Sequence, residues 1–280
     1  MKTDLKDKAI GRLERTNDTL DLRQARLMQL TLDQPPTLDK GDPLPPFWHY
    51  LYFNPQIRAS DLAEDGHEKL GRFIPDFGLP RRMWAGGRVT IDKPLLLGEE
   101  VDKVSRISAV EEKNGRSGRL CFVTVDHDFS VQGDHRIRET QKIVYRQAAT
   151  KETVQPQGQP APDNFTFSQI VTPNPVMLFR YSALIFYGHR IHYDASYTRK
   201  TEGYPGLVVH GPLTATLLIG LGLKRLGSRR ITHFDIRAMS PLFDTAPFRL
   251  EGRDTKEGVA LWARAPDGTT AMTVTLHASH

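Results

Sequence analysis

The chain has 280 residues, with 38 basic and 33 acidic side chains, 39% hydrophobic residues and a formal charge of +5. These proportions are typical of a soluble globular protein with one large domain or two ordinary ones, and they exclude collagen and wholesale disorder. The basic residues form no block of five like charges, so nucleic-acid binding is not favoured.

The beginning of the chain, MKTDLKDKAIGRLERTND, carries charges where a signal peptide needs an apolar core. No stretch reaches the roughly 18 uninterrupted apolar residues that a membrane span requires. The single cysteine, Cys121, excludes an internal disulfide and a multi-cysteine metal site. We therefore expect a cytoplasmic protein without a membrane partner.

The first half of the chain has the pattern of a helix followed by a sheet. Residues 16–32 carry leucines at helical spacing, with Thr16 or Asp18 as candidate N-caps. Runs with strand character follow from RVTIDKPL at residue 88 to HRIRETQKIVYRQ, which ends at residue 147, and turns at 113–115 and 132–134 separate them. They predict an antiparallel sheet.

A polar segment divides the chain into similar halves. Residues 150–162, TKETVQPQGQPAP, contain three prolines and only one large apolar residue, Val154. Such a segment cannot contribute to a core. It predicts a linker over 150–163 between domains at 1–149 and 164–280.

The second half repeats the pattern with a more apolar helix. Residues 211–226, GPLTATLLIGLGLKRL, have Pro212 in the first turn and leucines on nearly every face, which predicts a buried helix. Strand-like runs follow between residues 230 and 279. A helix followed by an antiparallel sheet, present twice, predicts an α+β protein in which each sheet wraps around a long helix.

Three of the ten histidines, His189, His192 and His210, lie within 22 residues of one another. Asp194 follows His192 closely enough to fix the tautomer of the imidazole and raise its basicity, so the group predicts a general base. The segment HGPL places the Gly211 amide at the start of the buried helix. Free N–H groups and the helix dipole at that point would stabilise a developing enolate oxygen.

Other chemistries have less support. The pair His189 and His192 fits a metal site poorly, because zinc takes three or four ligands and helical histidine pairs are usually four residues apart. The sequence contains no GxSxG, P-loop or GxGxxG motif, so nucleotide hydrolysis and hydride transfer are not favoured. We expect no metal and no cofactor.

The run YSALIFYGHRIHYDASYTRKTEGYPGLVVHGPLTA, residues 181–215, resembles the MaoC-like, or hydratase-2, branch of the hotdog superfamily. The signature of that family is G-D-x-N-P-x-H, followed by an HG that opens the central helix. Residues 83–129 resemble the N-terminal half of the same family. The resemblance implies a double hotdog, with two antiparallel sheets each wrapped around a long central helix, in which residues 1–149 form a non-catalytic hotdog and residues 164–280 carry the catalytic motif.

The resemblance also assigns roles to individual residues. The final histidine of the signature falls on His192, which would activate the water that adds to the β-carbon. Tyr187 stands at the position of the family's aspartate and His189 at that of its asparagine, so Tyr187 or His189 would bind or relay a proton near the α-carbon. The Gly211 amide would hold the thioester oxygen, and His210 would bind substrate.

Two further roles follow from charge. Asp194 would orient or charge His192. Arg190 stands where the family has proline, and a buried guanidinium there needs a partner such as the second carboxylate of a dicarboxylyl-CoA. The alternative is that Arg190 points outward or pairs with Asp194 or Glu202.

Within the family, the motifs are most similar to hydratases of mesaconyl-C4-CoA and itaconyl-CoA. The expected activity is the reversible hydration of such a C5 dicarboxylyl-CoA to citramalyl-CoA, with the acyl-CoA as the partner. The alternatives are dehydration of 3-hydroxyacyl thioesters in fatty acid synthesis, a non-catalytic acyl-CoA-binding protein, and thioester hydrolysis. Pairing of the halves across a homodimer stays open, and Arg225, Arg229 or Arg230 would meet the CoA phosphates.

Overall fold

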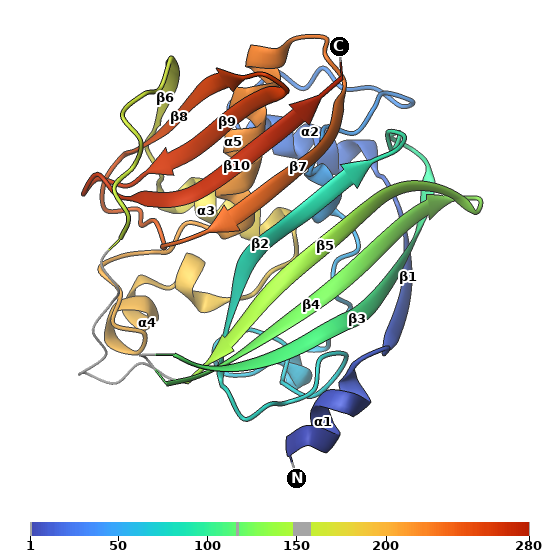
Figure 1. Cartoon of the computed structure of the whole chain (residues 1–280), viewed down its shortest axis with the longest axis vertical. Helices are drawn as coiled ribbons and strands as arrows, with labels where there is room; N and C mark the ends of the chain where they lie inside the picture. The colour runs from blue at the N-terminus through green and yellow to red at the C-terminus, as the bar shows by residue number, and fades with distance from the viewer. Residues whose placement is uncertain (1, 116–117, 148–157, 280) are drawn as a thin grey trace.

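The computed structural model describes residues 2–115, 118–147 and 158–279. Ten strands form one continuous antiparallel sheet in the order β1-β3-β4-β5-β2-β7-β10-β9-β8-β6. Figure 1 shows the sheet in front of helices α2, α3 and α5. The two strand sets therefore join edge to edge, as predicted, and make one sheet instead of two separate ones.

The N-terminal half contributes five strands and two helices. The strands are β1 (Leu13–Thr19), β2 (Arg81–Ile91), β3 (Glu100–Gly115), β4 (Gly118–Val131) and β5 (Asp134–Arg146). The helices are α1 (Lys2–Ala9) and α2 (Leu22–Thr31), and the 3-10 turns are η1 (Trp48–Leu51) and η2 (Ala59–Asp61).

The C-terminal half repeats this strand order around a longer helix. Its strands are β6 (Phe167–Val171), β7 (Ile231–Ala238), β8 (Phe248–Thr255), β9 (Gly258–Arg264) and β10 (Thr270–Ala278). Its helices are α3 (Pro175–Leu184), α4 (Ala195–Lys200) and α5 (Gly211–Leu226), with the 3-10 turn η3 (Arg190–His192). In each half the second strand lies at the inner edge, so β2 and β7 meet at the centre of the sheet (Figure 1).

The junction between the halves is an antiparallel pairing of β2 with β7, from Gly86 opposite Arg237 to Thr90 opposite His233. Gly86 has a φ of +109°, and a Cβ on it would lie 2.1 Å from the Ile236 carbonyl oxygen. A β-bulge between Trp84 and Gly86 interrupts the pairing of β2 with β5. The glycine is therefore required by the close approach of the two halves.

Helix α5 spans the predicted residues and packs against β8, β9 and β10. Pro212 lies in its first turn, where the missing N–H has no intrahelical partner to lose. Eight of its side chains are buried, among them Leu213, Leu218 and Ile219. The apolar pattern of the sequence thus becomes the core of the C-terminal half, as expected.

The prediction for the first helix was wrong at its start. Thr16 and Asp18 belong to strand β1, which pairs with β3, and helix α2 begins only at Leu22, with the Asp21 side chain accepting a hydrogen bond from the Gln24 amide. The helix packs against α3 and η1. It has 10 residues and is therefore shorter than the predicted helix over 16–32.

The segment between the halves is described only in part, because residues 150–157 of the expected linker lie outside the described residues. Pro160 pairs with Thr269, and the Ala161 amide donates to the Gly268 carbonyl at 2.9 Å. The end of the segment thus attaches to the turn between β9 and β10.

Among the described helices, none combines the length and the apolar character that a membrane span requires.

Candidate active site

The signature segment lies between two capped helices. The Asn174 side chain accepts a hydrogen bond from the Met177 amide at the start of α3, and the Asp194 side chain accepts one from the Tyr197 amide at the start of α4. Both are side-chain N-caps of the ordinary kind. Residues 185–194, which contain His189 and His192, run from the C-terminal end of α3 to the N-cap of α4.

His192 is buried, with 6% of its surface exposed. Its Nδ1 lies 2.7 Å from the Val208 carbonyl oxygen, which only accepts hydrogen bonds, so Nδ1 carries the proton and Nε2 is free to accept one. Burial lowers the pKa of His192 to about 4. The ring is therefore neutral at pH 7, with a basic nitrogen held in a fixed direction.

His210 precedes α5 and packs directly on His192. The two rings are stacked, with centroids 3.6 Å apart and planes 15° apart. Nε2 of His210 lies 2.8 Å from Oγ of Ser182, whereas Nδ1 is buried with no hydrogen-bond partner among the described residues. Burial holds the pKa of His210 well below its usual value. The stacked pair stands next to Gly211, the first residue of α5.

Tyr187 and His189 complete the group from the signature segment. The Tyr187 ring centroid lies 5.9 Å from that of His192, and the His189 centroid lies 5.4 Å from it. Burial raises the pKa of Tyr187 and lowers that of His189. The structure therefore brings together the four aromatic polar residues that the sequence singled out.

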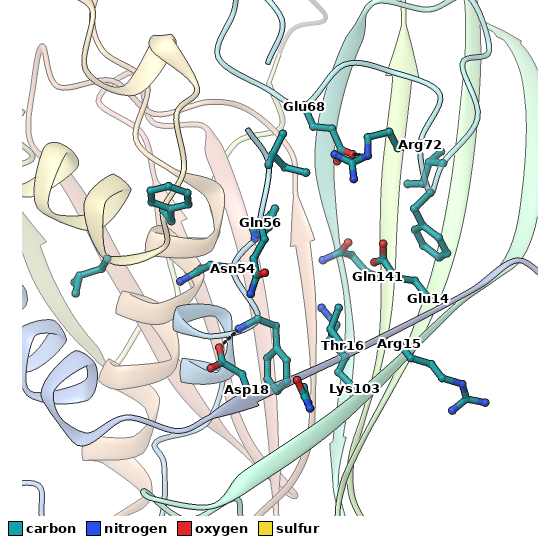
Figure 2. A pocket seen from close by; sticks show the side chains of 18 of the residues that line it. Glu14, Arg15, Thr16, Asp18, Asn54, Gln56, Glu68, Arg72, Lys103 and Gln141 are labelled. Atoms are coloured by element: carbon teal, nitrogen blue, oxygen red, sulfur yellow. Dashed lines mark hydrogen bonds and ion pairs between the residues drawn. The ribbon is translucent and has the colours of Figure 1, made fainter. Parts of the chain in front are cut away.

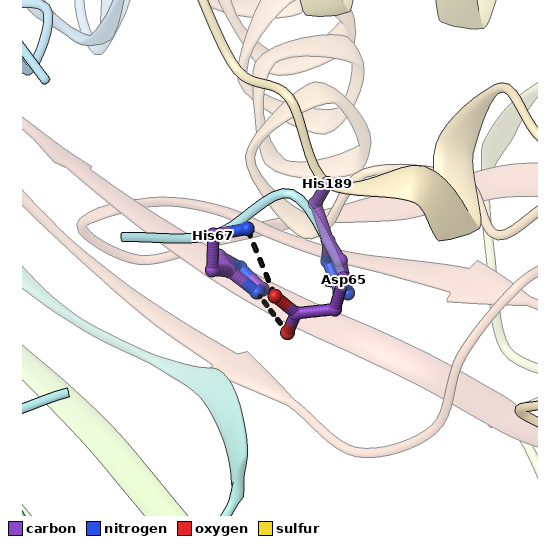
Figure 3. Close-up of side chains that lie close together, drawn as sticks. All are labelled: Asp65, His67 and His189. Carbon is purple, nitrogen blue, oxygen red and sulfur yellow. Dashed lines mark hydrogen bonds and ion pairs between the residues drawn. The ribbon is translucent and has the colours of Figure 1, made fainter. Parts of the chain in front are cut away.

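Two residues of this site were missed by the sequence analysis, because they come from the other half. Asp65 and His67 lie in the loop between η2 and β2, and Figure 3 shows them facing His189. His67 Nδ1 lies 2.9 Å from a carboxylate oxygen of Asp65, and its Nε2 is hydrogen-bonded to the Tyr187 hydroxyl. The segment DGHEKLG has no pattern that relates it to a segment 120 residues later, so only the fold reveals the contact.

Backbone contacts hold this loop against the signature segment. The Arg190 amide donates to the Asp65 carbonyl at 2.9 Å, and Gly66 and Gly188 meet so closely that a Cβ on Gly66 would lie 1.9 Å from the Gly188 oxygen. Gly66 has a φ of +84°, which side chains with a Cβ rarely adopt. The N-terminal half is therefore part of the site.

The structure gives Asp194 and Arg190 partners other than the expected ones. One carboxylate oxygen of Asp194 caps α4, and the other accepts hydrogen bonds from Arg190 Nε and Nη2 at 3.1 and 2.8 Å. The Arg190 guanidinium also stacks on the Tyr197 ring. Asp194 therefore does not orient His192, whose partner is Val208, and Arg190 is engaged in its loop as the alternative interpretation expected.

A cavity of about 1000 Å³ is lined mostly by residues of the N-terminal half, together with Ala183, Leu184 and Phe186 of the C-terminal half. Figure 2 shows Lys103 and Gln141 on one side of it and Asn54 and Gln56 on the other. Its lining does not include the three histidines of the signature region, but it does include Arg82. The cavity therefore reaches the site through this arginine.

Arg82 differs from its neighbour in having no acidic partner. Arg81 forms an ion pair with Glu202 at 2.7 Å, whereas no described carboxylate lies within 4.0 Å of the Arg82 guanidinium. Instead the guanidinium lies beside the hydroxyl groups of Tyr187 and Tyr145. Among the described residues Arg82 therefore has no counter-ion, and it lies between the cavity that it lines and Tyr187 of the site.

The basic residues expected to meet CoA phosphates are held by the protein itself. Arg225 pairs with Asp254, Arg229 donates to the Ala278 carbonyl, and Arg230 donates to the Asp92 carbonyl. Their role toward the CoA phosphates stays a prediction.

Comparison with known proteins identifies the family of the chain. A family model described as hydroxyacyl-thioester dehydratase type 2 matches residues 47–244, which is most of the chain. The chain belongs to the hydroxyacyl-thioester dehydratase type 2 family. This membership confirms the resemblance to MaoC-like hotdog proteins, and with it the expected enzyme class, a hydro-lyase.

Relatives in this family carry informative names. A protein of Chloroflexus aurantiacus named mesaconyl-C(4)-CoA hydratase is 43% identical over 270 residues, which are 95% of each chain. The mitochondrial hydroxyacyl-thioester dehydratase type 2 of Schizosaccharomyces pombe is 30% identical over 235 residues, covering 74% of this chain and 77% of that protein.

Solved structures confirm the hotdog fold. HtdX of Mycobacterium tuberculosis aligns with a TM-score of 0.67 at 17% identity, over 94% of this chain and 98% of that one. The MaoC-like dehydratase of Phytophthora capsici aligns with a TM-score of 0.69 at 14% identity over 98% of each chain. A second M. tuberculosis protein, described as a double hotdog, aligns with a TM-score of 0.58 at 11% identity over 96% of each chain.

Proposed function

We propose that this hydro-lyase adds water to the double bond of mesaconyl-C4-CoA or a close C5 dicarboxylyl-CoA analogue, giving citramalyl-CoA. The observation that carries the proposal is the free Nε2 of His192, held by Val208 in a buried site next to the N-terminus of α5. The relative from C. aurantiacus, which carries the name of such a hydratase, supports the choice of substrate.

The chemistry follows from the positions of the groups. His192 Nε2 takes a proton from water while the water oxygen bonds to the β-carbon, and the electrons of the double bond move onto the thioester oxygen. The Gly211 N–H and the positive end of the α5 dipole stabilise that enolate oxygen. Tyr187 then delivers a proton to the α-carbon, so that the elements of water are added across the bond.

This machinery distinguishes between the two C5 substrates. In mesaconyl-C4-CoA the double bond is conjugated with the thioester carbonyl, so addition of water at the β-carbon produces a thioester enolate. In itaconyl-CoA the double bond is one carbon further from the thioester, and addition there produces no such enolate. An oxyanion site at α5 therefore favours the conjugated mesaconyl isomer.

The second carboxylate of the substrate needs a cation close to the reacting carbons. In mesaconyl-C4-CoA that carboxylate is bonded to the β-carbon itself. Arg190 is already paired with Asp194, whereas Arg82 lies beside Tyr187 and has no acidic partner among the described residues. A half-buried guanidinium without a counter-ion is costly unless a ligand pairs with it. We therefore assign the recognition of the distal carboxylate to Arg82.

The test is a panel of thioesters comprising mesaconyl-C4-CoA, itaconyl-CoA, crotonyl-CoA and a long-chain trans-2-enoyl-CoA, with products identified by mass spectrometry. The proposal expects the highest kcat/KM for mesaconyl-C4-CoA, with citramalyl-CoA as product and without release of free thiol. Preference for the long-chain substrate would favour the 3-hydroxyacyl-thioester dehydratase named in the family description. Binding without turnover of any substrate would favour a non-catalytic acyl-CoA protein.

The role of Arg82 is tested with the same two short substrates. Arg82→Met should lower kcat/KM for mesaconyl-C4-CoA by about 30-fold or more, since removing one partner of a desolvated charge pair costs about 2 to 5 kcal/mol. Crotonyl-CoA has no second carboxylate and should lose far less. Equal losses on both substrates would contradict the assignment, because kcat/KM compares transition states within one enzyme preparation.

A further inference from the structure

The hydrogen bonds of His67 form a chain that runs from one half of the protein to the other. A carboxylate only accepts hydrogen bonds, so His67 Nδ1 carries the proton that lies between it and Asp65. Nε2 of the neutral ring is then the acceptor for the Tyr187 hydroxyl. The order carboxylate, imidazole, hydroxyl is the one that activates a hydroxyl oxygen in hydrolytic triads.

The charges around His67 determine what it can hold. Asp65, Tyr187 and His189 contact it, and the charges of Arg82 and Glu202 also act on it. Partial burial alone would raise the pKa of Asp65. The hydrogen bond and the charge interaction with His67 have the larger opposite effect, so the pKa is lowered and the carboxylate is ionised at neutral pH. Burial lowers the pKa of His67 itself. The ring is therefore neutral at rest and holds an extra proton only briefly, with the Asp65 carboxylate as its stabilising partner.

His189 connects this chain to the general base. Its ring centroid lies 3.8 Å from that of His67 and 5.4 Å from that of His192. His189 is thus in ring contact with both His67 and His192, and Tyr187 lies beside all three rings. The proposed hydration leaves a proton on His192 and takes one from Tyr187, so each turnover requires that His192 lose a proton and Tyr187 regain one.

We propose that Asp65 and His67, from the N-terminal half, complete the active site as a positioning pair that returns this proton to Tyr187; the proposal rests on the function proposed above. After water has added, the proton on His192 passes through His189 to Nε2 of His67. The Nε2–H then donates to the Tyr187 oxygen while the Tyr187 O–H proton moves to the α-carbon and the enolate electrons form the new C–H bond. Every group ends in its resting state.

The same cluster also fits an alternative, because Asp65, His67 and His189 lie close enough together to hold a metal ion. Two observations favour the proton relay. Both ring nitrogens of His67 already have partners, and one of these partners is Tyr187, which faces His192. A metal would require the Asp65–His67 hydrogen bond to break. The experiment below distinguishes the two.

The test is a double-mutant cycle on mesaconyl-C4-CoA hydration. Tyr187→Phe should lower kcat by about a hundredfold or more. Asp65→Asn, which keeps the shape of the side chain but removes its charge, should lower kcat at least tenfold with little change in KM. In the Tyr187→Phe background, Asp65→Asn should have no further effect, because both residues act through one proton transfer. Asp61→Asn, at the end of η2 and paired with the exposed Arg58, is the matched control and should retain wild-type kcat.

The outcomes separate this proposal from the proposed function. An active wild type whose Asp65→Asn variant is fully active, or loses the same factor in both backgrounds, would refute the relay and leave the function standing. A wild type that hydrates none of the thioesters would refute both. Loss of activity on dialysis against a chelator, restored by one equivalent of zinc, would replace the relay with a metal site. Retained activity with chelator is the expected result.

Discussion

The imidazole rings of His192 and His210 stack with centroids 3.6 Å apart, and both rings are buried. A proton on either ring would face the other without solvent to screen it, and the charge of His192 contributes to the low pKa of His210. The pair is therefore neutral at physiological pH. A general base that is neutral and has a fixed tautomer is ready to accept a proton.

The pH dependence of activity should reflect this burial. Burial lowers the pKa of His192 from its ordinary value to about 4, so the base stays unprotonated at mildly acidic pH. As the pH is lowered, we expect kcat/KM for mesaconyl-C4-CoA to decrease with a midpoint near pH 4 rather than near 6.5. Initial rates from pH 4 to 8, with brief assays to avoid unfolding, measure it. A limb near 6.5 would mean that a solvent-exposed histidine or another group is the base.

His192→Ala should reduce turnover by at least about a hundredfold while leaving the fold intact, because general-base catalysis contributes a factor of that size or more. His233→Ala, in which the replaced ring is on β7 and outside the site, is the matched control. Circular dichroism and thermal unfolding of both variants check the fold. Normal activity of His192→Ala would shift the role of base to His189.

Arg190→Met should affect mesaconyl-C4-CoA and crotonyl-CoA alike, unlike Arg82→Met. The ion pair of Arg190 with Asp194 is partly exposed, with 33% and 28% of the two side chains accessible, and pairs of this kind contribute about 0.2 to 1 kcal/mol to stability. We expect a small decrease in melting temperature and similar, modest losses of kcat/KM. A loss confined to the dicarboxylate would restore the original assignment of Arg190 to the substrate.

Gly66→Ala should remove most of the activity without unfolding either half. The new Cβ would lie 1.9 Å from the Gly188 oxygen, so the loop that carries Asp65 and His67 must move away from the signature segment. Gly78→Ala is the control, since Gly78 also has a positive φ, of +68°, but has no atom within 4 Å of the added Cβ. Measurement of kcat for both variants distinguishes loss of activity through displacement of the loop from loss through backbone strain. Equal losses of kcat in the two variants would show that backbone strain alone accounts for the effect.

Stability should decrease as the pH falls from 7 to 5. His127 and His192 are buried, and burial lowers the pKa of each to about 4, so between that value and 6.5 the unfolded chain binds protons that the folded chain does not. Each then costs up to about 2 kcal/mol by pH 5. Urea unfolding at pH 7, 6 and 5 measures the slope, and His127→Gln should reduce it by about one proton. A free energy of unfolding that does not change over this range would contradict the neutral state of both rings.

The sequence predicted those parts of the protein that depend on local pattern. Helix α5 was placed correctly because its apolar residues and Pro212 define it without reference to the rest of the chain. The first helix was misplaced because strand β1 has an almost wholly exposed, polar sequence, LERTNDT, whose pairing with β3 no local pattern reveals. Leucine spacing therefore extended the prediction into the strand.

The candidate site likewise contains residues that the sequence predicted and residues that only the fold brings in. The signature segment identified Tyr187, His189, His192 and His210 because they are close in sequence, and the structure places their rings together. Asp194 misled the prediction because two residues of separation in a loop do not fix a direction, and the carboxylate caps α4 instead. Asp65, His67 and Arg82 reach the site only through the packing of one half on the other.

The β2–β7 junction has a consequence for the order in which the protein is made. Strand β7 begins about 140 residues after β2 ends. During synthesis the inner edge of β2 therefore stays unpaired for on the order of ten seconds, until β7 has been made. The free N–H and C=O groups of such an edge can pair with strands of other chains unless charges or bulges prevent it. Strand β2 has both, since Arg81, Arg82 and Arg88 lie along it and a bulge interrupts it at Trp84 and Gly86. The arginine that we assign to substrate recognition thus also belongs to the group that would keep the nascent N-terminal half soluble until its second half arrives.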